Sequence, residues 1–164
     1  MQANLTTEDE LRAEGYVPAQ VVWRDQTYLH PRFGLMRSFD VIGDVPSTRG
    51  VYLFTQGREV VRVRYCGRTR HFWMVTRGQL PGGVARGGNR YGRPRWAGDT
   101  RQRVNAQLTK DCVPPDVGTH TAAYEHEPRM WTRALPDASW DELGDEEDAA
   151  IARWGLLRDG WNRL

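Results

Sequence analysis

The sequence predicts one small α/β domain with an N-terminal appendage, and three observations support this class. The length of 164 residues suits one compact unit, and 39% hydrophobic residues, with 7 Trp and 6 Tyr, can form its core. Two apolar runs at 50–54 and 60–66 surround a polar turn, as in an antiparallel hairpin. Two segments, 99–111 and 140–154, repeat their apolar residues at helical spacing.

The first 49 residues are expected to form an extension with a short helix and a strand. Thr7 and Glu10 have the spacing of a capping box, and Gly15 would end the helix. Residues 20–30 are expected to form one strand or an irregular hairpin. We therefore divide the chain into an extension, 1–49, and a main domain, 50–164. The extension would add to the sheet, or supply a surface for a dimer or for target recognition.

The hairpin predicted over 50–66 brings two tyrosines onto neighbouring strands. Val61, Val63 and Tyr65 are expected to share one face of the second strand, with the two arginines between them on the other face, because side chains alternate along a strand. Tyr52 lies in the first strand. The two tyrosines are therefore expected on adjacent antiparallel strands, in a register that the sequence does not specify.

The remaining elements follow from composition and spacing. The stretch 78–99 is rich in Gly, Pro and Arg and predicts a long loop, while 120–127 predicts a third strand. The helix at 99–111 would be capped by Asp99 or Thr100, with Val104 and Leu108 on one face. The last helix begins with acids, as helix N-termini favour, and Gly155 would end it.

A concentration of arginine marks the middle of the chain. Residues 60–110 contain 12 Lys and Arg and a single acid, whereas residues 111–164 contain 5 basic and 12 acidic residues. Codon usage in a GC-rich genome explains arginine in place of lysine, but not the scarcity of acids before Asp99. The asymmetry therefore predicts a polyanionic partner for this segment.

The composition also excludes several classes. No apolar run approaches the length of a transmembrane span, so we expect no membrane partner, and the acidic N-terminus lacks the apolar stretch of a secretory signal. The two cysteines form neither a disulfide framework nor a zinc-binding spacing. The expected location is the cytoplasm.

Glu147 is a candidate functional residue because it lies on the apolar stripe of the last helix, with Leu143, Ala150, Ile151 and Trp154. A buried carboxylate must be paired, protonated or bound to a metal. The structural alternative is an ion pair with one of the many arginines. The functional alternative is a ligand for a hard divalent cation, since one carboxylate with waters and phosphate oxygens can hold Mg²⁺.

The two strands of the predicted hairpin each carry a tripeptide that combines a tyrosine with a glycine. Gly50-Val51-Tyr52, followed by Tyr65-Cys66-Gly67, resembles the signature of the GIY-YIG nuclease family. Members of that family also have, in order, a helix with an arginine, a helix with a glutamate and a terminal asparagine. The resemblance covers residues 50–162. It implies a small sandwich in which a mainly antiparallel three-stranded sheet is flanked by helices.

The resemblance also implies residue roles. Tyr52 and Tyr65 match the motif tyrosines, with Tyr52, or a water that it orients, as general base. Glu147 matches the metal-binding glutamate and would hold Mg²⁺ or Mn²⁺. Asn162 matches the terminal asparagine, although it lies further from Glu147 than the family pattern expects.

The arginine that would stabilise the phosphate has more than one candidate. Arg103 begins a helix pattern like that of the family and is preferred. Arg77 is closer to Tyr65 but precedes a glycine, and Arg101 is a further alternative. Other residues are expected to bind the substrate, namely Arg68, Arg70, Arg90, Tyr91, Arg93 and Arg95. The alternative for 86–96 is a solvated loop with Trp96 in the core.

Together these residues imply a metal-dependent endonuclease that hydrolyses phosphodiester bonds in DNA. The preference for DNA over RNA belongs to the family and not to these residues. One alternative is a binding module on the same scaffold that does not cut nucleic acid. Another is a basic RNA-binding or protein-interaction domain whose likeness to the family is accidental.

Overall fold

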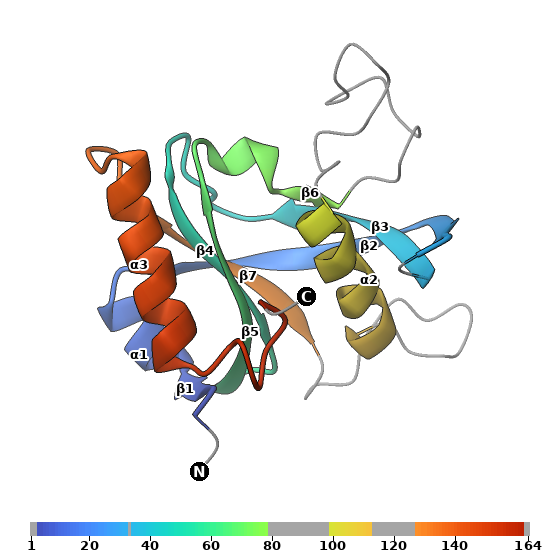
Figure 1. Ribbon diagram of the computed structural model, residues 1–164, viewed down its shortest axis with the longest axis horizontal. Coiled ribbons are helices and arrows are strands. Elements are labelled where there is room, and N and C mark those ends of the chain that lie inside the picture. Colours follow the sequence, from blue (N-terminus) through green and yellow to red (C-terminus); the bar gives the residue numbers. More distant parts are fainter. Residues whose placement is uncertain (1–2, 33, 79–98, 113–126, 163–164) are drawn as a thin grey trace.

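The computed structural model describes residues 3–32, 34–78, 99–112 and 127–162, and its centre is a 7-stranded sheet (Figure 1). The strands pair in the order β1-β5-β4-β7-β2-β3-β6, and every pairing is antiparallel. Their bounds are β1 (Leu5–Thr7), β2 (Val17–His30), β3 (Gly34–Ile42), β4 (Gly50–Gln56), β5 (Val60–Thr69), β6 (Arg77–Gly78) and β7 (Pro128–Ala134). The helices are α1 (Glu8–Ala13), α2 (Asp99–Cys112) and α3 (Trp140–Arg153), with a 3₁₀ turn η1 (Phe72–Met74).

The α/β class is confirmed, but the predicted three-stranded sheet is wrong. The segment before residue 50 contributes β1, β2 and β3 to the same sheet, and β2 joins it by pairing with β7. The β2–β3 hairpin was hard to recognise because its register shifts between Trp23 and Thr27, which breaks the alternation of a regular strand. The strand expected at 120–127 lies outside the described residues except for Glu127, and β7 begins one residue later.

The predicted hairpin of β4 and β5 is confirmed, but one of its faces differs from the prediction. Phe54 pairs with Tyr65 and Thr55 pairs with Val63, so Arg64 is an extra residue in the ladder. Such a bulge reverses the side to which the following residues point. The expectation that Val61, Val63 and Tyr65 share a face is therefore wrong, because Tyr65 points to the opposite side.

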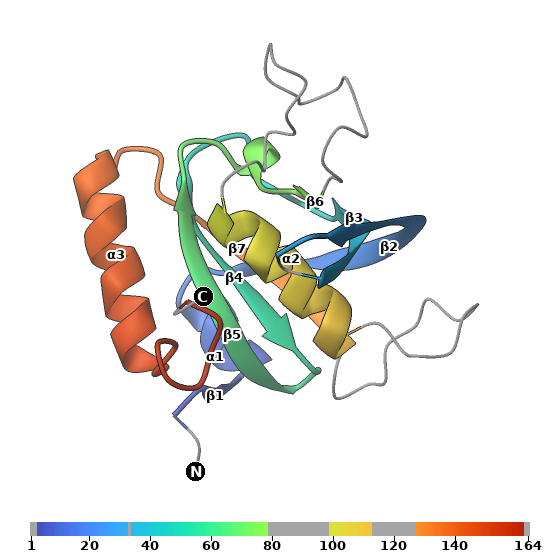
Figure 2. The ribbon, with the colours of Figure 1, turned by 45° about the vertical axis from the view of Figure 1, so that its right-hand side comes forward.

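The sheet has a hydrophobic core on each face. Val104 and Leu108 of α2, which packs on β3, share one core with Tyr52 and Tyr65. The other core joins Leu143 of α3 and Leu11 of α1 to alternate residues of β4 and β5. Because neighbouring residues of a strand point to opposite faces, α2 and α3 cover opposite sides of the sheet. In Figure 2 β5 runs between these two helices.

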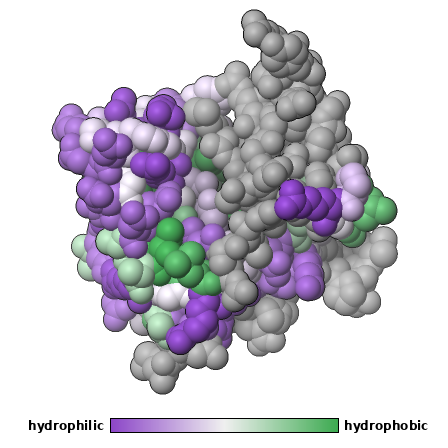
Figure 3. All heavy atoms as spheres, viewed as in Figure 1, coloured by the Kyte–Doolittle hydropathy of each residue, from purple (hydrophilic) through white to green (hydrophobic). Residues whose placement is uncertain are grey.

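The boundaries of α1 and α3 follow local signals, of which the sequence predicted Thr7 and Gly155, whereas the predicted caps Asp99 and Thr100 lie inside α2. Thr7 caps α1 by accepting a hydrogen bond from the backbone N–H of Glu10, and Ser139 caps α3 with a complete capping box. Gly155 takes a φ of 61° directly after α3, a left-handed conformation that favours glycine. Hydrophilic residues dominate the surface over α3 (Figure 3). Within the described ranges, no helix has the length and apolar character of a membrane span.

Candidate functional site at the edge of strand β5

Tyr52 and Tyr65, the predicted motif tyrosines, lie side by side on the α2 face of the sheet. Their ring centroids are 5.9 Å apart and their planes are tilted by 45°. Only 3% of Tyr52 and 8% of Tyr65 is exposed. The structure thus brings the two tyrosines together, in the core between the sheet and α2.

Gly67, the last residue of the second motif, leaves the space that the Tyr52 ring occupies. A Cβ at this position would lie 2.5 Å from Tyr52 Cζ and 2.6 Å from its Oη. Any side chain here would therefore displace the phenol ring. The glycine lets the Tyr52 hydroxyl lie directly against the backbone of β5.

The edge of β5 that faces away from β4 is only partly covered by another strand. β1 pairs with residues 60–62, and further along the edge the partners are single residues from other segments. Val63 donates its N–H to the Asn4 carbonyl at 2.8 Å, and the Trp161 N–H donates to the Arg64 carbonyl at 2.6 Å. These contacts satisfy backbone groups that would otherwise be open to another chain.

Asn162, the predicted terminal asparagine, continues this edge. Its Oδ1 accepts a hydrogen bond from the Cys66 N–H at 3.0 Å, and its Nδ2 donates to the Cys66 carbonyl at 2.7 Å. A side-chain amide presents one donor and one acceptor as a peptide group does. Asn162 therefore pairs with β5 in the place of a strand residue.

Glu147, the predicted metal ligand, reaches the same edge from α3. The backbone N–H of Arg68 lies near its carboxylate. Burial raises the pKa of Glu147 and the Asp148 charge adds to this, while the Arg68 charge and this N–H act to lower it, so the pKa is above its ordinary value. Among the described residues no arginine forms an ion pair with Glu147, and the nearest interacting groups are the charge and the backbone N–H of Arg68.

Three predicted residues thus meet at three consecutive residues of β5. Asn162 binds Cys66, Tyr52 packs on Gly67, and Glu147 lies near the N–H of Arg68. The three contacts span about 7 Å of strand. Tyr52 approaches from the α2 face and Glu147 from the α3 side, with the backbone of β5 between them.

The candidate arginines occupy different places in the fold. Arg103 and Arg101 belong to α2, the helix that shares a core with the tyrosines, whereas Arg77 belongs to β6, at the far edge of the strand order. Arg68 lies beside Glu147, and the guanidinium groups of Arg68 and Arg70 both stack on the ring of Trp140. The remaining substrate-binding candidates lie outside the described residues, namely Arg90, Tyr91, Arg93 and Arg95.

Sequence reasoning missed Trp140 and Gly144, which both contact Arg68. The Arg68 Nη1 donates to the Trp140 carbonyl at 2.7 Å, and a Cβ at Gly144 would lie 2.4 Å from the same nitrogen. The available signal was Gly144 itself. Glycine is unfavourable inside a helix, and its presence there indicates a close packing partner.

The side chains at this edge can supply a divalent cation with one carboxylate ligand. No group of three potential metal ligands of the His, Cys, Asp or Glu type exists among the residues that the structure describes. Glu147 is a half-buried carboxylate, and one such group with waters and phosphate oxygens is a usual arrangement for Mg²⁺. Glu147 is therefore the residue that would hold the ion.

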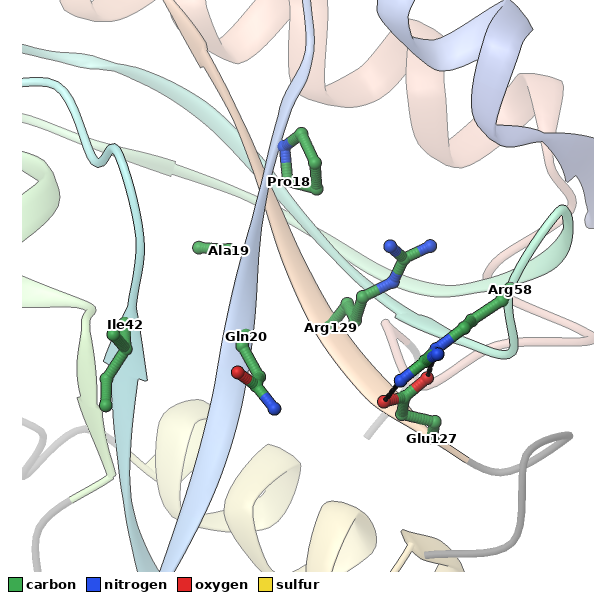
Figure 4. Close-up of a pocket in the computed structure, with 7 residues that line it drawn as sticks. All are labelled: Pro18, Ala19, Gln20, Ile42, Arg58, Glu127 and Arg129. Carbon is green, nitrogen blue, oxygen red and sulfur yellow. Dashed lines mark hydrogen bonds and ion pairs between the residues drawn. The ribbon is translucent and has the colours of Figure 1, made fainter.

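A separate pocket lies beside β2 and β7, away from this edge (Figure 4). It has a volume of about 350 Å³, and its charged groups are already paired. Arg58 pairs with Glu127, and Arg129 pairs with Glu8. The pocket therefore offers no uncompensated arginine to a polyanion, which leaves the edge of β5 as the better candidate site.

Comparisons of the chain with family models, curated proteins and solved structures found no match.

Proposed function

We propose that this chain is a metal-dependent endonuclease that hydrolyses phosphodiester bonds in DNA. The observation that supports it most is the convergence of Tyr52, Glu147 and Asn162 on residues 66–68 of β5. Arg68 adjoins the carboxylate, and Arg70 stacks with Arg68 on Trp140. A phenol can activate a water, a carboxylate can hold a metal ion, and guanidinium groups can stabilise charge on the phosphate, as phosphodiester hydrolysis needs.

Each residue has a role in this proposal. Glu147 holds Mg²⁺ or Mn²⁺, which supplies Lewis-acid stabilisation of the phosphate charge when bound. Tyr52, supported by the neighbouring Tyr65, accepts the proton of the attacking water or orients that water. Arg103 of α2 stabilises charge on the phosphate, since a guanidinium group matches phosphate oxygens in shape and charge. The arginine-rich segment 60–110 attracts the polyanion.

A second candidate function is binding of nucleic acid without cleavage. It is favoured by the burial of Tyr52 and Tyr65, and by the use of both Asn162 amide atoms on the backbone of Cys66. In this case the contacts along the edge of β5 would serve the fold, and the arginines alone would contact the ligand.

The deciding experiment is cleavage of supercoiled plasmid by the purified protein, with Mg²⁺ and with EDTA, for wild type and Glu147→Gln. Glutamine keeps an oxygen for the Arg68 N–H but removes the charge, which separates the metal role from the structural one. Asp145→Asn is the matched control, because Asp145 is an exposed acid on the same helix.

Cleavage that is lost in EDTA and in Glu147→Gln, but kept in Asp145→Asn, supports the nuclease. Retention of DNA without cleavage under all metal conditions supports the binding module. Cleavage that persists in Glu147→Gln contradicts the assignment of the metal ligand.

A further inference from the structure

Three arginines gather around the loop that leads into α3. Arg68 and Arg70, from β5 and its end, place their guanidinium carbons 4.1 Å and 4.0 Å from the centre of the Trp140 ring. Arg49, just before β4, donates a hydrogen bond to the Ala138 carbonyl at 3.2 Å. We call Arg49, Arg68, Arg70 and Trp140 the arginine platform.

The arginine platform carries more positive charge than its surroundings balance within the described residues, where the Glu147 carboxylate near Arg68 is not close enough to form an ion pair. No carboxylate there forms an ion pair with Arg49, Arg68 or Arg70. Elsewhere arginines of the same protein are paired with glutamates, as in Arg133 with Glu146 and Arg153 with Glu14. Three like charges held beside one loop repel one another, and an external anion would remove that repulsion.

The side chains of the platform are held by packing. Arg68 is half-buried, donates to the Trp140 carbonyl, and fills the space above Gly144. Arg70 is exposed, and its stacking on the indole leaves the N–H groups at the edge of the guanidinium plane open to a ligand. A pre-positioned guanidinium loses less conformational entropy when it binds an anion.

The platform lies at a fixed distance from Glu147. Trp140 and Glu147 are two turns apart on α3, which corresponds to about 10 Å along the helix axis. This equals roughly three base-pair steps of duplex DNA. Arg68 connects the two places directly, since its backbone N–H lies near Glu147 and its side chain binds Trp140.

We propose that the arginine platform binds backbone phosphates of a nucleic acid one to three nucleotides from the bond at Glu147. Trp140 is a positioning residue that holds Arg68 and Arg70, and Arg70 makes the main phosphate contact. The ligand class rests on the proposed function, whereas the affinity for phosphate rests on the platform alone.

The test measures binding of a fluorescently labelled DNA duplex, and separately of inorganic polyphosphate, by fluorescence anisotropy over a range of salt concentrations. The variants are Arg70→Gln, Trp140→Leu and Trp140→Phe. Arg153→Gln is the matched control, because Arg153 also stacks on a tryptophan but is paired with Glu14. Gly144→Ala adds a methyl group that would displace Arg68. Thermal unfolding confirms that each variant is folded.

We expect Arg70→Gln to weaken binding about five- to tenfold and to reduce the salt slope by about 1, as for one lost phosphate contact. Trp140→Leu and Gly144→Ala should weaken binding to a similar degree, and Trp140→Phe should restore most of it. Arg153→Gln should stay within about twofold of wild type. If the wild-type protein binds DNA and Arg70→Gln weakens this binding no more than Arg153→Gln does, the platform proposal is wrong. The nuclease proposal is not affected by that result.

The two proposals fail in different ways. If wild type binds polyphosphate through Arg70 and Trp140 but neither binds nor cuts DNA, the proposed function is wrong and the platform stands. If wild type binds neither polyanion, the platform is wrong as well. Because Arg70 is exposed, its variant tests the platform even if Trp140→Leu fails to fold.

Discussion

At the scale of single residues, Gly67 shows how one small side chain determines the position of a functional one. The ring of Tyr52 occupies the volume that a Cβ of residue 67 would need. The second motif therefore has a packing reason for its glycine, independent of any catalytic role. The tyrosines and the glycine were predictable as a set from the sequence, but their contact depends on the pairing of Tyr52 with Gly67.

Gly67→Ala should destabilise the protein by about 1–3 kcal/mol, because the new methyl group overpacks against the Tyr52 ring. Urea denaturation measures this change in the free energy of unfolding. In a Tyr52→Leu background the same substitution should cost much less, since the clash is gone, and the difference is the coupling between the two sites. Equal costs in both backgrounds would contradict the contact.

Glu147 predicts a pH dependence of stability whose sign follows from its raised pKa. A carboxyl group with a pKa above 4.5 in the folded state keeps its proton there after the unfolded chain has lost it. The contribution of Glu147 to stability is therefore present at low pH and falls as pH rises from 4.5 through the folded pKa. Glutamine has no proton to lose.

The stability of Glu147→Gln relative to wild type should accordingly increase between pH 4 and pH 7. Urea unfolding of both proteins at a series of pH values measures the difference, with Asp145→Asn as the control. A difference that does not vary with pH would contradict the raised pKa.

At the scale of elements, β5 depends on single residues to complete its edge. Asn4, Trp161 and Asn162 each satisfy backbone groups that β1 does not reach. Local sequence could not reveal this, because each partner is distant along the chain. What the sequence did reveal was the strand itself, from its alternating residues, and the two long helices, from their spacing and, in α3, from the acidic first turn.

Asn162→Ala should lower the free energy of unfolding by about 1–3 kcal/mol, since it leaves the N–H and carbonyl of Cys66 without partners. Chemical denaturation gives the value, and Arg158→Gln is a nearby control with an exposed side chain. Loss of plasmid cleavage with unchanged stability would instead assign Asn162 a direct role in catalysis.

At the scale of the whole molecule, the segment before residue 50 belongs to the same sheet and core as the motifs. Val21 and Trp23 of β2 and Phe39 of β3 pack in the core that contains Tyr52 and Tyr65. The sequence predicted the chemistry-bearing half of the fold better than this half, because the shift in β2 conceals its alternation. The β4–β5 hairpin has the clearer sequence pattern. It forms only one side of a wider sheet, in which β7, β2, β3 and β6 follow β4.

A fragment of residues 50–164 should therefore fail to fold on its own. Without β2 and β3, the outer edge of β7 and the apolar core around Tyr52 would be exposed to water. Near-ultraviolet circular dichroism and thermal unfolding of the fragment and of the full chain test this. A cooperative transition in the fragment would show that residues 50–164 form an autonomous domain.

The bulge at Arg64 has a consequence for how related sequences should be compared. A relative without the extra residue would carry its buried tyrosine one position earlier, and an ungapped alignment would equate Tyr65 with a residue on the opposite face. Alignments of such relatives therefore need a one-residue gap between Val63 and Tyr65. On the α3 face of β5 the buried positions are odd before the gap, at Val61 and Val63, and even after it, at Cys66.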